Sequence, residues 1–125
     1  MHRSRLQSVV IDCDDLDTGI SFWTGALGVS VVGRHEDVYR RLESPIPGLR
    51  ILLQRVPEQK TAKTRVHLDI ESDDIEAEVR RLEKLGAKRL EQVEDWWVME
   101  DPCGNEFCVV PATTPEFASA HEWES

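Results

Sequence analysis

The sequence predicts an α+β fold built from two βαβββ modules within a single domain of residues 1–125. Two observations support this fold class. A strand-like segment followed by a capped helix occurs twice, and each copy ends in an apolar segment before a proline, Pro57 or Pro111. The expected parts are a first module over residues 6–57, a polar linker over 58–64, a second module over 65–111 and a tail over 112–125.

The first module begins with a half-buried strand and a helix. Apolar residues alternate through residues 8–13 (SVVIDC), which is the period of a strand. Asp14 or Asp15 can cap the helix, apolar residues recur at helical spacing over 16–27, and Gly28 suits the helix end. Three further strands are expected over residues 29–35, 37–44 and 49–56.

The second module repeats this order. Residues 66–71 alternate between apolar and polar side chains, and Asp73 is expected to cap the following helix, with Glu76 three residues later as in a capping box. Apolar residues recur at helical spacing over 75–85, and Gly86 suits the helix end. Three more strands are expected over residues 87–94, 95–101 and 106–110.

The two modules align with each other along most of their length. Asp15 corresponds to Asp74 at an offset of 59 residues, and ILLQRVP (51–57) corresponds to NEFCVVP (105–111) at an offset of 54. By this alignment the equivalent strand positions are Ser8 with His67 and Gln54 with Cys108.

The composition excludes several classes of function. The net charge of −9 leaves no basic patch of the kind that nucleic-acid binding needs. No apolar run reaches the roughly 18 residues of a membrane span, and the first residues lack the apolar core of a signal peptide. We therefore expect a cytoplasmic protein without a nucleic-acid or membrane partner. The three cysteines contain no CxxC pair, which argues against a disulfide framework.

Three segments together resemble the vicinal oxygen chelate superfamily, also called the glyoxalase/bleomycin-resistance/dioxygenase superfamily. They are DLDTGISFWTGALG, HLDIESDDIEAEVRRLEKLGA and DPCGNEFCVVP, and the likeness covers residues 6–111. The sequence is most similar to a glyoxalase-like subfamily whose members mostly lack a known substrate. The resemblance implies that each module forms a curved mixed sheet, as in dihydroxybiphenyl dioxygenase, and that paired modules enclose a cup. It also implies a homodimer with a small-molecule ligand.

The resemblance further implies metal ligands on the first and last strands of each module. These positions fall on Ser8, Gln54, His67 and Cys108. The usual ligands there are His, Glu or Gln, and His67 is the only one of the four residues that is a strong metal donor of a usual type. Serine is a poor ligand, Gln54 offers an uncharged amide, and Cys108 stands where Glu is usual. We therefore expect no metal cofactor, although a softer divalent ion held by His67, Gln54 and Cys108 is the alternative.

Other polar and aromatic residues are candidates for the cup. Alternation places Asp69 and Glu71 on the same face of the strand as His67, where a His–carboxylate pair suits general-base chemistry. His67 is thus the best catalytic candidate, and no other catalytic residue is evident. Trp96 and Trp97 point to opposite faces of their strand, and we expect Trp97 to line the cup.

These observations predict a protein that binds a small hydrophobic or aromatic molecule in the cup, without the usual metal. The expected ligand contacts are Ser8, Gln54, His67, Asp69, Trp97 and Cys108. Two alternatives stay open: a divergent metal-dependent lyase, isomerase or dioxygenase, and a non-catalytic structural or regulatory dimer. Whether the protein is an enzyme is not decided by the sequence.

Overall fold

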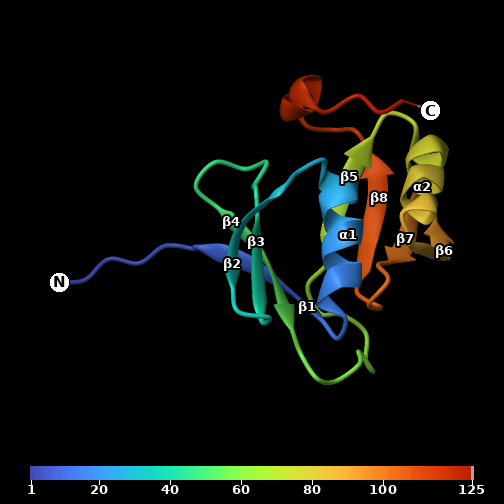
Figure 1. The fold of residues 1–125 in the computed structure, drawn as a ribbon. Coiled ribbons are helices and arrows are strands. Elements are labelled where there is room, and N and C mark those ends of the chain that lie inside the picture. The colour runs from blue at the N-terminus through green and yellow to red at the C-terminus, as the bar shows by residue number, and fades with distance from the viewer. Residues whose placement is uncertain (125) are drawn as a thin grey trace. The chain divides into compact units, whose positions relative to one another are not determined.

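The computed structural model describes residues 1–124, which form two successive sets of one helix and four strands (Figure 1). The first set is β1 (Ser8–Cys13), α1 (Leu16–Leu27), β2 (Val31–His35), β3 (Tyr39–Leu42) and β4 (Arg50–Arg55). The second set is β5 (Leu68–Ser72), α2 (Ile75–Lys84), β6 (Lys88–Val93), β7 (Trp96–Glu100) and β8 (Glu106–Pro111), followed by a short 3₁₀ helix, η1 (Pro115–Ser119). The predicted fold class, α+β with two βαβββ modules, is confirmed.

Each module forms its own mixed four-stranded sheet with the same strand order. The orders are β1-β4-β3-β2 and β5-β8-β7-β6, in which the first two strands are parallel and the other neighbours are antiparallel. The chain divides into two compact units, Met1–Gln59 and the part from Lys60 onward. This division falls within the predicted linker, and the arrangement of both modules in one domain stays a prediction.

In the second unit, one face of the sheet is buried against α2. Phe107 and Val109 of β8 are almost fully buried together with Val79 and Leu82 of α2. Because successive side chains of a strand point to opposite faces, Cys108 lies on the face away from α2. The helix therefore decides which side chains of β8 are left to build a site.

In the first unit, α1 packs closely against the Cys13 side chain at the end of β1. Phe22 and Trp23 of α1 are buried, as is Cys13 at the end of β1. A Cβ atom on Gly19 would lie 2.5 Å from Cys13 Sγ, so any side chain there would force Cys13 or the helix to shift. Glycine at this position lets the helix approach the sheet.

The residue that caps one of the two helices differs from the prediction. The side chain of Asp15, one of two candidates, caps α1 by accepting a hydrogen bond from Thr18 N. In α2 the cap is Asp74, which accepts from Ala77 N, so the prediction of Asp73 was wrong. Asp74 is the residue that matches Asp15 in the alignment of the modules, and it alone is placed to reach the third residue of the helix.

The strand pairing also corrects the alignment of the last strands. Val10 pairs with Leu52 in the first unit, and Asp69 pairs with Cys108 in the second. Since Val10 and Asp69 are equivalent at the helix offset, Leu52 and not Gln54 is the equivalent of Cys108. The alignment through the two prolines was therefore wrong by two residues. A shift of two residues along a strand keeps each side chain on the same face of the sheet but changes the residue with which it pairs.

The segment after β8 is fastened to the second unit at two places. The carboxylate of Glu71 accepts hydrogen bonds from the backbone of Thr113 and Thr114 and from the Thr114 hydroxyl, and these bonds lower the Glu71 pKa. Further on, the guanidinium of Arg81 stacks on the ring of Trp123, with its Cζ atom 3.6 Å from the ring centre. Among residues 1–124, no helix has the length and apolar character to cross a membrane.

The β6–β7 turn provides a test of backbone strain. Glu94 has a φ of 51°, in the left-handed region that favours glycine. We expect Glu94→Gly to raise the free energy of unfolding by about 0.5–1 kcal/mol, because relief of strain exceeds the entropic cost of glycine. Thermal or urea unfolding of the full chain measures this difference. Asp95→Gly is the matched control, since Asp95 does not have a positive φ, and a stabilisation of equal size there would contradict the explanation.

Candidate functional site

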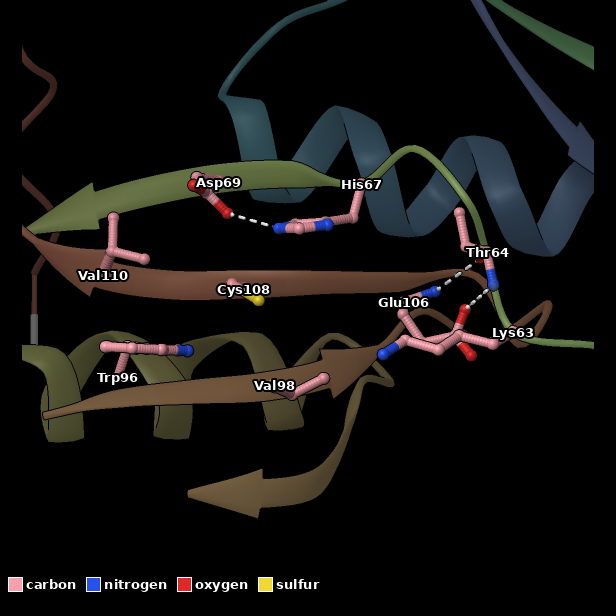
Figure 2. Close-up of a pocket in the computed structure, with 9 residues that line it drawn as sticks. All are labelled: Lys63, Thr64, His67, Asp69, Trp96, Val98, Glu106, Cys108 and Val110. Carbon is pink, nitrogen blue, oxygen red and sulfur yellow. Dashed lines mark hydrogen bonds and ion pairs between the residues drawn. The ribbon is translucent and has the colours of Figure 1, made fainter. Parts of the chain in front are cut away.

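A pocket of about 410 Å³ lies on the second unit, on the face of its sheet away from α2 (Figure 2). Its walls come from β5, β7 and β8 and from the segment that precedes β5. The lining residues are Lys63, Thr64, His67, Asp69, Trp96, Val98, Glu106, Cys108 and Val110. All of them belong to the second unit, so this unit forms the pocket with its own side chains.

Strand register brings the central residues of the pocket together. Asp69 of β5 pairs with Cys108 of β8, which pairs in turn with Val98 of β7. Paired residues on neighbouring strands share a face, so these three side chains form a row across the sheet. His67 lies just before β5, two residues from Asp69, and Figure 2 shows both side chains turned toward each other beside Cys108.

One side of the pocket is a polar cluster of His67, Asp69 and Cys108. Their ligand atoms all lie within 4.8 Å of one another. Nε2 of His67 is 3.1 Å from Oδ1 of Asp69, and both side chains are about half exposed. Burial raises the pKa of the Cys108 thiol and the charge of Asp69 raises it further, while Lys63 opposes both effects. The thiol is therefore protonated at neutral pH when no cation is bound.

The other side of the pocket is apolar. Trp96 and Val98 reach it from β7, and Val110 reaches it from β8 (Figure 2). Trp97 lies on the opposite face of β7, where the guanidinium of Arg89 lies 5.0 Å from the centre of its ring. The aromatic residue of this pocket is thus Trp96, and the predicted ligand contact of Trp97 is not supported by this pocket.

Residues from the predicted linker form one end of the pocket. The carboxylate of Glu106 accepts hydrogen bonds from Lys60 Nζ at 2.7 Å and from the backbone N–H of Thr64 at 2.9 Å. Burial opposes ionisation of Glu106, but these hydrogen bonds outweigh it and lower its pKa to about 2. Glu106 is therefore ionised and neutralised by Lys60, and it holds the linker against β8.

Three of the six predicted ligand contacts meet in this pocket: His67, Asp69 and Cys108. Ser8 and Gln54 lie on β1 and β4 of the first unit, and their role stays a prediction. Sequence reasoning missed several lining residues. Glu106 and Val110 could have been found by alternation from Cys108 along β8, and Val98 by alternation from Trp96 along β7. Lys63 and Thr64 carry no periodic signal, because they belong to the linker and not to a strand.

A comparison with known protein families identifies the family of this chain. A model of a glyoxalase-like domain matches residues 8–110. The chain belongs to this glyoxalase-like family. The superfamily resemblance seen in the sequence is thereby confirmed. No curated protein matches the sequence of this glyoxalase-like chain.

Several solved structures share the fold of this chain. A glyoxalase/bleomycin resistance protein/dioxygenase family enzyme from Burkholderia phytofirmans is 18% identical, with a TM-score of 0.66 over 85% of this chain and 97% of its own. A fosfomycin resistance protein from Listeria monocytogenes is 16% identical, with a TM-score of 0.69 over 92% and 96%. The trypanothione-dependent glyoxalase I of Leishmania major is 20% identical, with a TM-score of 0.61 over 87% of both chains. At these identities the likeness shows the fold alone.

The residues of this glyoxalase-like site can be tested for their fit to a metal. The cluster offers one imidazole, one carboxylate and one thiol, whereas the predicted set had an amide from Gln54 and no carboxylate. Hard ions such as Mg²⁺ prefer oxygen ligands throughout, but Zn²⁺ accepts nitrogen, sulfur and oxygen. The cluster therefore fits Zn²⁺ better than Mg²⁺. A bound zinc ion would supply a Lewis acid beside the apolar wall.

The low pKa of Glu106 predicts a pH-dependent contribution to stability. Its folded value of about 2 lies below the roughly 4.3 of an unfolded chain. A carboxyl group shifted in this direction stabilises the fold above pH 4, and the contribution is lost as the pH falls toward 2. We expect Glu106→Gln to lower the free energy of unfolding by about 1–2 kcal/mol at pH 7 through weaker hydrogen bonds. Urea unfolding across this pH range measures the difference.

The matched control for this prediction is Glu91→Gln, since Glu91 is an exposed residue of β6. Its effect should stay within about 0.5 kcal/mol. A Glu106→Gln difference that is as large at pH 2.5 as at pH 7 would contradict the assignment of an ionised, hydrogen-bonded carboxylate.

Proposed function

We propose that this glyoxalase-like protein binds a small molecule with an aromatic or hydrophobic part in the pocket of its second unit. The observation that carries the proposal is the division of the pocket into two sides. An apolar wall is made by Trp96 and Val98 of β7, which lie across from the polar pair His67 and Asp69, together with Val110 of the intervening strand β8 (Figure 2). Ligand sites commonly combine such an apolar lining with a few placed polar groups.

The size and charge of the pocket narrow the class of ligand. A volume of about 410 Å³ falls within the range of small-molecule sites. The ring of Trp96 suits stacking with a flat group, and His67 is placed to hydrogen-bond a polar substituent. Glu106 is neutralised by Lys60, which leaves Asp69 and Lys63 as the charged groups of the lining. A ligand that carries both an aromatic ring and an oxygen-bearing group fits this lining best.

We propose that this binding does not need the hard metal ion that the superfamily resemblance implies. The cluster contains one carboxylate, Asp69, in place of the oxygen-rich set that such an ion prefers. An enzymatic role is the second candidate, because His67 and Asp69 lie 3.1 Å apart as a base and its orienting carboxylate would. The names of the Listeria and Leishmania structures, a resistance protein and a glyoxalase, are consistent with either role. A purely structural role is less favoured, since the pocket is not filled by its own side chains.

We also propose that the protein is cytoplasmic and, from the superfamily resemblance, that it acts as a homodimer. Light scattering coupled to size-exclusion chromatography measures the molar mass in solution. A mass equal to that of one 14.3 kDa chain at micromolar concentration would contradict the dimer.

The aromatic wall gives a direct test of ligand binding. Titration of the protein with a panel of aromatic carboxylates, phenols and quinones should identify compounds that quench tryptophan fluorescence. For such a compound, Trp96→Ala should weaken binding by about tenfold, because one aromatic contact contributes roughly 0.5–1.5 kcal/mol beyond its buried area. Isothermal titration calorimetry measures the dissociation constant independently of fluorescence.

Trp97→Ala provides the comparison for this test. Trp97 follows Trp96 in β7 but lies on the face that carries Arg89, so its removal should weaken binding less than the removal of Trp96. Equal losses in both variants would argue against the pocket on this face of the sheet. The absence of binding across the whole panel would argue against the proposed function itself.

A further inference from the structure

We infer that His67, Asp69 and Cys108 form a zinc-binding cluster that the second unit builds alone. The inference goes beyond the proposed function and shares only its pocket. It differs from the ligand pattern that the superfamily resemblance implies, which draws on the first and last strands of both modules. Here Asp69, two residues after His67, supplies the carboxylate that is missing at Cys108.

The distances within the cluster suit one small ion. Bonds of about 2.0–2.3 Å to a tetrahedral zinc ion place its ligand atoms roughly 3.3–3.8 Å apart. The corresponding atoms of the three residues already lie within 4.8 Å of one another, and His67 and Asp69 are 3.1 Å apart. Shifts of about 1 Å therefore suffice to close the cluster around an ion.

The burial of Cys108 and the exposure of His67 and Asp69 are suited to such a closure. Cys108 is 7% exposed and is held on β8, the strand between β5 and β7. His67 and Asp69 are about half exposed, and His67 lies outside the regular part of β5. The buried thiol thus provides a fixed ligand, while the two exposed side chains are free to adjust their rotamers toward it.

The chemistry of the donors selects the ion. A thiolate favours Zn²⁺ over Mg²⁺ or Ca²⁺, and an imidazole and a carboxylate complete three protein ligands. Zinc sites with three protein ligands keep one position open, and here the pocket with Trp96 adjoins the cluster. Binding requires that the ion displace the thiol proton of Cys108, so zinc affinity should rise with pH. The negative charges of the Asp69 carboxylate and a Cys108 thiolate would together balance the two positive charges of Zn²⁺.

Cobalt substitution tests this inference with a spectroscopic readout. The full-length protein is first treated with a chelator and then titrated with Co²⁺ alone. We expect a sulfur-to-cobalt charge-transfer band in the near ultraviolet and visible bands of a four-coordinate ion. One equivalent of Zn²⁺ should abolish both sets of bands, and millimolar Mg²⁺ should leave them unchanged.

Single substitutions assign the ligands. Cys108→Ser should abolish the charge-transfer band, whereas Cys103→Ser, outside the cluster, should retain it. His67→Ala and Asp69→Asn should each weaken zinc binding by about tenfold or more in competition with a chromogenic chelator. Because Cys108 is buried, circular dichroism must show that its variant is folded. If it is not, the two exposed positions carry the test.

Several results would overturn the inference: a charge-transfer band in folded Cys108→Ser, equal displacement of cobalt by Mg²⁺, or undiminished zinc affinity in Asp69→Asn. A loss of affinity in Gln54→Ala as large as in Asp69→Asn would also overturn it, since the site would then require the first unit. Repeating the tryptophan titration in excess chelator separates this inference from the proposed function. A protein that binds zinc but no compound of the panel would support this inference and reject the proposed function. A protein that binds a compound but fails to bind zinc would do the reverse.

Discussion

The burial of alternate residues of β8 against α2 is the constraint on which the pocket depends. Phe107 and Val109 are almost fully buried, which places Cys108 on the opposite face. A shift of one residue in the register would expose both apolar side chains and bury the neighbours that now line the pocket. Since burying a large apolar side chain contributes about 1.5–3 kcal/mol, such a shift would cost several kcal/mol. The hydrophobic core therefore determines which chemical groups the pocket contains.

Contacts outside the sheet complete the pocket. The ionised carboxylate of Glu106 binds Lys60 and the backbone of Thr64, and it thereby holds the segment before β5 on the end of β8. The same segment leads directly to His67, which has no strand partner to fix its position. Because Thr64 is anchored, the free part of the chain is limited to the residues between Thr64 and β5. The hydrophobic core thus positions Asp69 and Cys108, and the polar contact of Glu106 helps to position His67.

Much of the fold could be predicted because periodicity and capping are local signals. The helices and all strands were expected close to their observed positions, and His67, Asp69 and Cys108 were among the candidates. The alignment of the last strands failed because proline marks a chain break and not a strand position: Pro111 ends β8, whereas Pro57 lies two residues beyond β4. Similarly, alternation shows that Trp96 and Trp97 face opposite ways, but only the pairing of Trp97 with the buried Val109 shows which one meets the helix.

The comparison of donor groups shows why a search by equivalent positions underestimates this site. Such a search examines Cys108, finds no carboxylate and treats the ligand set as lost. A strand, however, presents every second residue on the same face, so Asp69 can supply a carboxylate next to His67 without occupying the usual position. Its pairing with Cys108 places these donors on adjacent strands. What matters for binding an ion is which donor atoms converge on one face of the sheet. In this unit an imidazole, a carboxylate and a thiol converge. Only the imidazole, that of His67, stands at a position where the family usually has the same residue.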